Sequence, residues 1–196
     1  MNDTLLANYI MGQESKKGTI DPSKIRYIKR SSCSPQMIKQ IKKITRKVMP
    51  KICTAVYQDL LKCNYNVFVY CENILVGFIC CVKSKKLNKT HGFDYDMIEA
   101  TGDTHKAIIE LLCLTPALQG LGVGKKIVTD FLKASGDLIV YVGTSKWFNF
   151  KFYEALGFHR FVHYKEGGMT YVWCKDKKKL NKLRKIKYDK DGNPVE

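Results

Sequence analysis

The chain has 196 residues, 45% of them apolar and 11% aromatic, which predicts one globular domain and excludes a largely disordered protein. Lysine and arginine number 34 against 18 aspartates and glutamates, so the formal net charge is +16. The longest apolar run, residues 74–82, is shorter than the roughly 18 residues that a membrane-spanning helix needs, so we expect no membrane helix.

The first residues lack the basic and long apolar regions of a signal peptide. We therefore expect a soluble intracellular protein, in the cytoplasm, with the nucleus left open. Residues 1–22 have no clear periodicity and are expected to be a flexible lead-in. Residues 176–196 are strongly charged and are expected to be a basic, disordered tail. The domain itself is then predicted to span residues 23–175.

Basic residues are concentrated in two blocks. Residues 16–51 hold twelve basic residues and one acid, and residues 177–187 hold seven basic residues and no acid. Such blocks favour anionic partners, for example nucleic acid, ribosomes or acidic proteins. The equally weighted alternative is a lysine-rich surface that is simply solvated.

The eight cysteines form no C-x-x-C pair and have no histidine at ligand spacing. Most lie within apolar stretches, where a free thiol behaves as a small hydrophobic group. We therefore predict reduced, buried thiols and no metal site. The residues concerned are Cys33, Cys53, Cys63, Cys71, Cys80, Cys81, Cys113 and Cys174.

The first half of the chain predicts a strand over residues 24–30 and then a helix that begins after Ser34 and Pro35. This helix has a strongly basic outer face and ends by Pro50, and residues 52–62 predict a second helix. Residues 66–84 predict two strands joined by a tight turn at Glu72 and Asn73. The polar residues 84–105 show no pattern and are expected to form a long loop.

The second half alternates strands and helices. Strands are predicted at residues 107–114 and 137–143, helices at 123–135 and 146–156, and a closing hairpin at 158–175. This order predicts a single α/β domain with a mixed, mostly antiparallel sheet flanked by helices and one parallel pair around a glycine-rich loop.

That loop, within LTPALQGLGVGKKI at residues 114–127, matches neither common phosphate motif. A P-loop would need a glycine in place of Gln119 and a hydroxyl in place of Lys126. The dinucleotide fingerprint would need a glycine in place of Lys125. The pattern present is Gln-x-x-Gly-x-Gly, formed by Gln119, Gly122 and Gly124.

This pattern resembles the pyrophosphate loop of the GNAT superfamily of acetyl-CoA-dependent N-acetyltransferases. A second signature of that superfamily, a helix that ends in a phrase like F-Y-E-x-L-G-F, is matched by NFKFYEALGF at residues 149–158. Two signatures in the right order are more specific than either alone. The resemblance covers roughly residues 66–174, and it implies a GNAT-like fold whose parallel strand pair splays at the coenzyme A site.

The resemblance implies acetyl-CoA as co-substrate and no metal. Main-chain N–H groups at a helix start suit a pyrophosphate, and glycine leaves room for its approach. The cofactor-binding residues implied are Leu112, Cys113, Leu114, Gln119, Gly120, Leu121, Gly122, Val123, Gly124, Lys125, Lys126, Asn149 and Tyr153. Many family members carry another Asn where this chain has Lys146, which leaves that contact open.

Two catalytic roles follow from the same resemblance. Tyr153 matches the tyrosine that can protonate the sulfur of coenzyme A, and Glu110, the only acid in its apolar strand, is the candidate base. A structural ion pair is the open alternative for Glu110, and a packing role is the alternative for Tyr153. We expect Tyr153 and Asn149 on a polar helix face toward the cofactor, with an apolar stripe through Phe152 toward the sheet. Direct transfer is expected, without an acylated Cys113.

The predicted function is transfer of an acetyl group from acetyl-CoA to a primary amine of a small molecule or a protein, within a ternary complex. The alternative is a basic nucleic-acid- or ribosome-associated protein that uses the fold for binding with little catalysis. It would bind through the basic helix of residues 35–48 and the basic tail.

Overall fold

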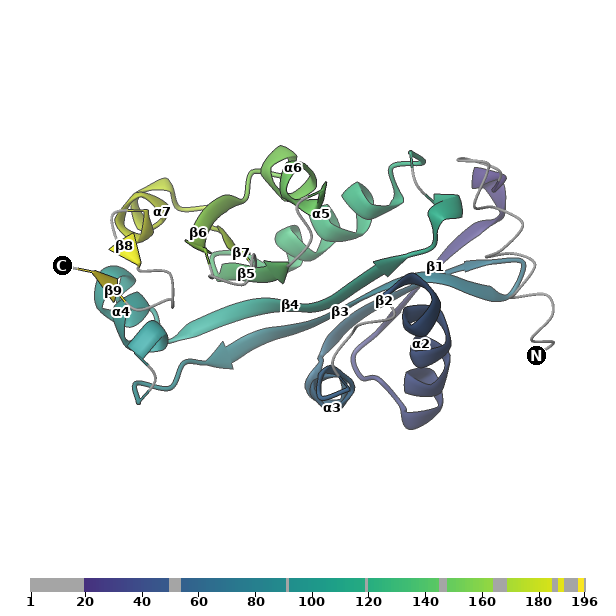
Figure 1. The fold of residues 1–196 in the computed structure, drawn as a ribbon, viewed down its shortest axis with the longest axis horizontal. Helices are drawn as coiled ribbons and strands as arrows, with labels where there is room; N and C mark the ends of the chain where they lie inside the picture. The colour runs from purple at the N-terminus through teal and green to yellow at the C-terminus, as the bar shows by residue number, and fades with distance from the viewer. Residues whose placement is uncertain are drawn as a thin grey trace. The chain divides into compact units, whose positions relative to one another are not determined.

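The computed structural model describes residues 20–49, 54–90, 92–118, 120–144, 148–163, 169–184, 187–188 and 194–195. The chain forms two compact units. The first, called here the N-terminal unit, comprises Met1–Val82 and Glu110–Phe131, and the second, the C-terminal unit, comprises Lys83–Ile109 and Leu132–Glu196. Figure 1 shows the elements of both.

A seven-stranded mixed sheet has the order β1-β2-β3-β4-β5-β7-β6. The pairs β1–β2, β2–β3, β5–β7 and β6–β7 are antiparallel, and β4–β5 is parallel. This arrangement confirms the predicted α/β fold with one parallel pair around the glycine-rich loop. The strands are β1 Ile25–Arg30, β2 Tyr65–Cys71, β3 Ile74–Lys86, β4 His105–Leu114, β5 Ile139–Thr144, β6 His159–His163 and β7 Met169–Trp173.

Six α-helices and three 3₁₀ turns accompany the sheet in the described residues. The helices are α2 Pro35–Val48, α3 Val56–Asp59, α4 Gly92–Thr101, α5 Val123–Ser135, α6 Phe148–Ala155 and α7 Lys177–Leu183. The 3₁₀ turns are η1 Pro22–Lys24, η2 Leu60–Lys62 and η3 Pro116–Leu118, and a short pair of strands consists of β8 Lys187–Tyr188 and β9 Pro194–Val195. No helix in the described ranges is both long and apolar enough to cross a membrane.

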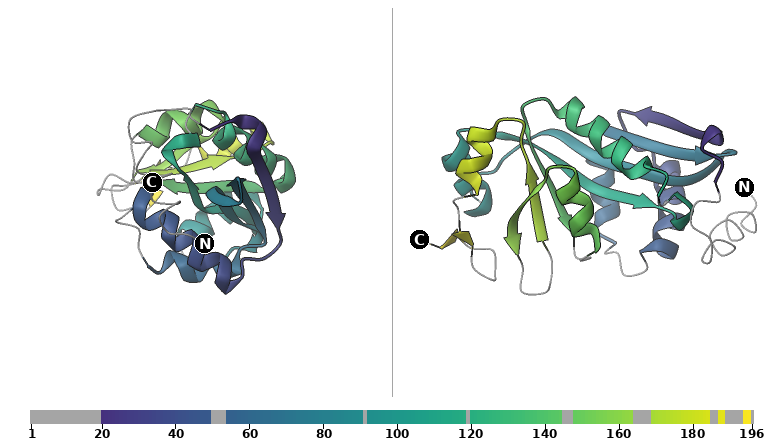
Figure 2. Two further views of the ribbon diagram at one scale, coloured as in Figure 1. Left: turned by 90° about the vertical axis from the view of Figure 1, so that its right-hand side faces the viewer. Right: turned by 90° about the horizontal axis from the view of Figure 1, so that it is seen from above.

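The N-terminal unit has helices on both faces of its strands (Figures 1 and 2). On one face, Ile41 and Ile44 of α2 share a buried cluster with Phe68 of β2 and Phe78 of β3. On the other face, the ring of Phe131 of α5 packs 5.1 Å from the ring of Tyr65. Since successive side chains of a strand point to opposite faces, Tyr65 and Phe68 contact different layers.

Local sequence accounts for α2 and for the β2–β3 turn as predicted. The Ser34 hydroxyl accepts a hydrogen bond from the Met37 N–H at 3.3 Å, and Pro35 occupies the first helical turn. Glu72 and Asn73 have φ values of 48° and 70°, as a two-residue turn of type I′ requires.

The C-terminal unit also carries helices on both faces of its strands. Tyr141 and Val172 share a buried cluster with Met97 of α4 and Leu183 of α7. Tyr171, the neighbour of Val172, instead packs against the ring of Phe150 of α6 at 5.8 Å. The extra layer formed by α4 and α7 thus covers the face opposite α6.

Three predictions from the sequence were wrong. The polar residues 84–105 are not one loop, because β3 continues to Lys86 and α4 follows, with Met97 fully buried. The tail after residue 176 is not wholly disordered, because α7 buries Leu180 and Leu183 in the core. The second helix is shorter than predicted, since α3 covers four residues and gives way to η2. The ends of the domain and of the lead-in remain predictions.

The predicted buried thiols are confirmed for the seven cysteines in the described residues, all of which are buried and outside any disulfide. Cys53 lies outside those residues. In the same part of the chain, no group of three or more His, Cys, Asp or Glu side chains is placed to hold a metal ion.

Candidate acetyl-donor and catalytic site

The parallel pairing of β4 stops well before the strand ends. The paired register with β5 covers Lys106 to Ile109, whereas β4 continues to Leu114. Pairing that ends at Ile109 leaves the last five residues of β4 beyond its register with β5, as expected for a splayed pair. Leu112, Cys113 and Leu114, the predicted thioester-binding residues, all belong to this part of the strand.

The side chains of this segment alternate in burial. Leu111 and Cys113 are 6% and 2% exposed and lie in the core cluster with α2, whereas Leu112 and Leu114 are half-buried on the other face. The Cys113 thiol therefore points into the core of the N-terminal unit. Its burial agrees with the expectation that no acylated cysteine forms.

Gly77 and Thr115, which the sequence reasoning missed, hold the end of β4 to β3. The Thr115 N–H donates to the Val76 carbonyl at 2.9 Å. A β-carbon at Gly77 would lie 2.6 Å from Cδ2 of Leu114 and 3.2 Å from the Cys113 carbonyl oxygen. Gly77 therefore allows a close approach, and a larger residue there would require Leu114 and the Cys113 backbone to shift. The sequence signal was a glycine within an apolar strand.

The glycine-rich loop connects η3 to the start of α5. Gly120 and Gly122 have φ values of 81° and 73°, and an added β-carbon at either position would meet no atom of the described residues within 4 Å. The first bond of the helix runs from the Lys126 N–H to the Gly122 carbonyl at 2.9 Å. The N–H groups of Val123, Gly124 and Lys125 therefore have no acceptor within the helix. Gln119 lies outside the described residues.

This loop has the features of an anion-binding site. Three consecutive N–H groups lie at the positive end of the helix dipole, and no described residue fills the space beside Gly120 and Gly122. The hydroxyl of Thr115, fully buried, has no hydrogen-bond partner among the described residues.

The two lysines after the loop differ in their surroundings. Lys125 is exposed. The Lys126 ammonium bonds the Asp130 carboxylate at 2.8 Å, which raises the pKa of Lys126, and it lies 5.2 Å from the centre of the Tyr27 ring. The charge of Lys126 is thus partly neutralised by Asp130, and Lys125 is the better placed of the two to add positive charge.

Glu110 lies in the N-terminal unit and is half-buried rather than fully buried. The negative charge of its carboxylate contributes to the raised pKa of two buried thiols. Burial is the main cause that raises the pKa of Cys63 to about 12, and the charge of Glu110 is the next. Burial likewise raises the pKa of Cys81, with smaller contributions from Cys63 and Glu110. Glu110 therefore lies near the segment that precedes β2, and it has partial access to water.

Asn149 and Tyr153 lie on α6, in the C-terminal unit. The Asn149 amide donates to the Thr144 hydroxyl at 3.1 Å, which ties α6 to the end of β5. The helix ends in a Schellman motif, in which the Phe158 N–H donates to the Tyr153 carbonyl at 3.1 Å and the Gly157 N–H to the Glu154 carbonyl at 3.0 Å. Gly157, the predicted residue after the helix, has a φ of 83°.

The expected division of α6 into a polar face and an apolar stripe was wrong. Tyr153 is 4% exposed, with its ring 5.5 Å from that of Phe158 and 5.9 Å from that of Tyr171, whereas Phe152 and Leu156 are half-buried. Tyr153 faces the sheet because the fully buried Tyr171 offers it an aromatic surface. Lys146 and the side chain of Phe148 lie outside what the structure describes.

The chain was compared with known families and proteins. The model of the Acetyltransferase (GNAT) family matches residues 38–158, which is more than half of the chain. Among curated proteins, no sequence match was found.

Solved structures share the fold at low sequence identity. Arabidopsis thaliana NAA60 in complex with acetyl-CoA is 14% identical, with a TM-score of 0.57 over 77% of this chain and 98% of that one. FeeM, an N-acyl amino acid synthase from uncultured soil microbes, is 13% identical, with a TM-score of 0.58 over 79% and 93%. Ard1 from Thermoplasma volcanium is 16% identical, with a TM-score of 0.53 over 76% and 97%.

Proposed function

The chain belongs to the GNAT acetyltransferase family, whose enzymes use acetyl-CoA as co-substrate, and we propose that it transfers the acetyl group to a primary amine. The acceptor is a small amine or an amine of a protein. The observation that carries the proposal is the start of α5, where open space beside Gly120 and Gly122 adjoins the N–H groups of Val123 to Lys125. These groups would hold the pyrophosphate of acetyl-CoA.

Transfer proceeds by direct attack in a ternary complex. The neutral amine nitrogen forms a bond to the thioester carbon, the carbon–sulfur bond breaks, and the amine loses a proton while the thiolate gains one. Glu110 would accept the amine proton, directly or through water, because its half-buried carboxylate retains access to solvent. Tyr153, held among the rings of Phe158 and Tyr171, would donate a proton to the sulfur.

The net charge bears on the acceptor. A chain with a formal charge of +16 repels a polybasic peptide at long range, whereas a small amine or a less basic protein meets little repulsion. A measured preference for lysine-rich peptides would contradict this part of the proposal.

The test is acetyl-CoA turnover against a panel of amines, with the acetylated product identified by mass spectrometry. Glu110→Gln should slow turnover by about a hundredfold to ten-thousandfold and shift its pH profile, since a general base contributes about 10²–10⁴. Glu99→Gln removes an exposed carboxylate from α4 and is the matched control, with turnover unchanged. Equal rates in the two variants would remove Glu110 from the role of base.

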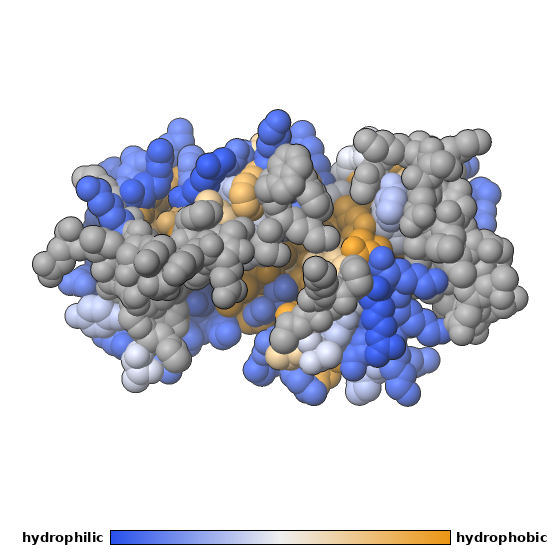
Figure 3. Space-filling model, viewed as in Figure 1, coloured by the Kyte–Doolittle hydropathy of each residue, from blue (hydrophilic) through white to orange (hydrophobic). Residues whose placement is uncertain are grey.

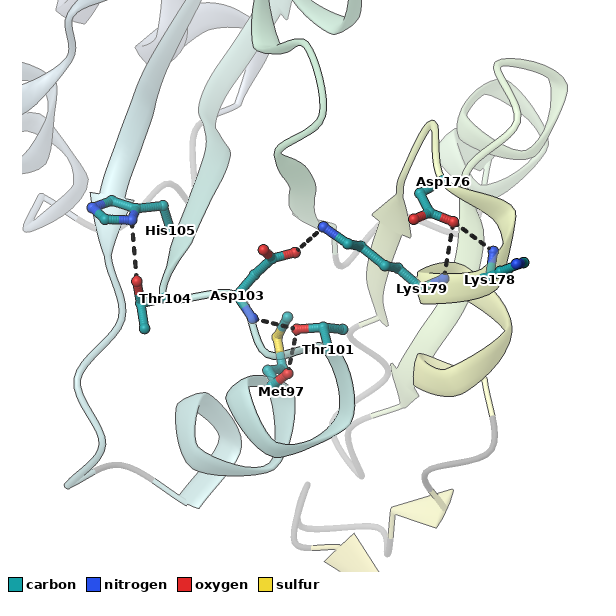
Figure 4. Close-up of polar contacts among 8 residues, drawn as sticks. All are labelled: Met97, Thr101, Asp103, Thr104, His105, Asp176, Lys178 and Lys179. Atoms are coloured by element: carbon teal, nitrogen blue, oxygen red, sulfur yellow. Dashed lines mark hydrogen bonds and ion pairs between the residues drawn. The ribbon is translucent and has the colours of Figure 1, made fainter.

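A second candidate function is binding to a nucleic acid or a ribosome through α7. Asp176 caps this helix, accepting from the N–H groups of Lys178 and Lys179 at 2.8 and 3.3 Å (Figure 4). The Lys179 ammonium pairs with Asp103 at 2.7 Å, and Leu180 and Leu183 are buried. The helix is thus held in place by one face.

The other face of α7 is exposed and positively charged, and it is the face that would contact an anionic partner. Lys177, Lys178 and Lys182 are exposed. A hollow of about 390 Å³ adjoins the end of the helix, lined by Glu154, Phe158, His159, Arg160 and Arg184, with Arg160 paired to Glu154 at 2.7 Å. The exposed Arg184 adds a positive charge to those of the helix lysines, and such a cluster suits phosphate groups.

Point variants test this candidate better than truncation, since removing residues 177–196 would expose the core that Leu180 and Leu183 cover. Lys177→Glu, Lys178→Glu and Lys182→Glu together should abolish salt-sensitive binding to an RNA oligonucleotide while turnover on a small amine persists. RNA binding that persists in this triple variant would exclude α7 as the interface.

A further inference from the structure

An apolar pocket opens between α2 and the start of β3 in the N-terminal unit. It has a volume of about 260 Å³ and is lined by Gln36, Lys39, Gln40, Lys43, Ile44, Ile74 and Leu75. The five helix residues recur at three- and four-residue intervals and so form one stripe of α2. None of the lining residues is among those assigned to acetyl transfer.

The floor of this pocket is the hydrophobic core itself. Ile44 and Leu75 are 1% and 3% exposed and belong to the cluster that joins α2 to the sheet, while Ile74 is half-buried. Only Tyr27, Leu61 and Tyr95 are large exposed apolar residues in the described part of the chain. A hollow that reaches core side chains on an otherwise polar surface marks a binding site. Since an apolar cavity of about 150 Å³ holds a benzene ring, this pocket has room for a bulky side chain.

The rim of the pocket is basic. Lys39 and Lys43 are exposed at its edge, one helical turn apart, and α2 carries three further bases and no acid. The surface of α2 visible in Figure 3 is accordingly strongly hydrophilic. Glu72, in the turn that leads into β3, is paired with Lys24. A ligand at this rim therefore meets positive charge, and a carboxylate is the complementary group.

Gln40 adds a polar requirement. Its side-chain oxygen is buried and accepts no hydrogen bond from the described residues. An acceptor that is buried without a donor costs roughly 1–3 kcal/mol. Because Gln40 lines the pocket, a rotation of its side chain would present this oxygen to a backbone N–H of a bound peptide.

We propose that this pocket binds an acidic peptide segment of a partner protein, with one bulky apolar side chain on the floor of Ile44, Ile74 and Leu75. Acidic residues that flank this side chain pair with Lys39 and Lys43, and a peptide N–H donates to Gln40. Three properties together select this partner: an apolar floor, a basic rim and an unpaired acceptor. A nucleic acid would use the basic rim but has no aliphatic or aromatic side chain for the floor.

The probe is a fluorescein-labelled peptide of glutamates with one central tryptophan, titrated with the full chain by fluorescence polarisation. Two further probes replace the tryptophan with alanine or the glutamates with lysine. We expect binding of the first peptide alone, with affinity at least about tenfold weaker for either replacement.

Two pairs of charge reversals on the same helix locate the binding. Lys39→Glu with Lys43→Glu should weaken the peptide by about tenfold or more, because both charges lie at the rim. Arg46→Glu with Lys47→Glu changes the net charge equally, at exposed positions outside the pocket, and should have a much smaller effect. Gln40→Leu, which removes the acceptor but keeps the apolar volume, should also weaken binding. Turnover on a small amine should stay constant in all of these variants.

Three results would overturn the proposal. If the two charge-reversal pairs lose equal affinity for the peptide, the peptide is held only by long-range attraction to the net charge. Equal affinity for the tryptophan and alanine peptides would show that the pocket floor is unused. An RNA oligonucleotide that binds more tightly than the peptide and is lost in the rim variant would assign the surface to nucleic acid.

Discussion

Gly122→Ala tests the role of the glycine-rich loop most sharply. Gly122 has a φ of 73°, and the left-handed conformation costs a residue with a β-carbon roughly 1–2 kcal/mol. No atom of the described residues lies within 4 Å of the added methyl group, so this backbone cost is the expected effect on folding. In a chain of this length it corresponds to a loss of roughly 2–8 °C in Tm.

The same methyl group would project into the space proposed for the pyrophosphate. Losing one hydrogen bond to a charged group costs about 1.5–3 kcal/mol, which predicts affinity for coenzyme A weaker by about tenfold to a hundredfold. The assay is isothermal titration of coenzyme A, with Tm measured in parallel.

Gly136→Ala is the matched control. Gly136 follows α5 at its other end, has a φ of 61°, and also has open space where the methyl group would lie. It should lose similar stability and keep its affinity for coenzyme A. If both variants bind coenzyme A equally well, the loop does not hold the pyrophosphate.

Three further predictions concern other parts of the molecule. Tyr153→Phe should keep the fold and the affinity for acetyl-CoA but lower turnover. Tyr153→Ala should instead cost about 3–5 kcal/mol of stability, because it opens a cavity beside Phe158 and Tyr171. An unchanged turnover rate in the phenylalanine variant would leave Tyr153 with a packing role alone. Burial, together with the charge of Glu110, raises the pKa of Cys63 to about 12, whereas a thiol in the unfolded chain has a pKa of about 8.5. The contribution of this thiol to folding stability is therefore fully present below pH 8.5 and is lost progressively as the pH rises toward 12. Between pH 8.5 and 10.5 the loss from Cys63 is at most roughly 3 kcal/mol, and urea unfolding of Cys63→Ala should show a correspondingly smaller decline; identical declines would refute the assignment. Asp103→Asn should weaken the docking of α7 by no more than about 1 kcal/mol, because both partners of the Lys179–Asp103 ion pair are about a third exposed. Hydrogen exchange of the α7 amides should then be several-fold faster. Unchanged exchange would show that Leu180 and Leu183 are sufficient to hold α7 in place.

The parts of the fold that local chemistry determines could be predicted from the sequence. Ser34 and Pro35 indicated the start of α2, Glu72 and Asn73 the turn between β2 and β3, and the apolar spacing of residues 123–135 the extent of α5. Each of these signals acts over a few residues, where hydrogen bonds and backbone sterics are decided locally.

The parts that depend on tertiary packing could not be predicted. In α7 only two leucines, three residues apart, lie among lysines, and in α4 the fully buried Met97 lies in a polar segment, so the apolar signal in each segment is short. Phe152 and Tyr153 are adjacent aromatics, and only the ring of Tyr171 on β7 decides which of them is buried. The unpaired hydroxyl of Thr115 likewise depends on contacts that no local motif encodes.

The central claim is that the chain moves an acetyl group from acetyl-CoA to an amine. Mass spectrometry of a panel of amines and peptides, incubated with acetyl-CoA and the purified chain, tests it most directly. The account predicts at least one N-acetylated product that forms with the wild-type chain and much more slowly with Gly122→Ala. Acetyl-CoA that stays intact with every acceptor would contradict it, and product that forms equally fast with the Gly122 variant at sub-saturating acetyl-CoA would contradict the role of the loop.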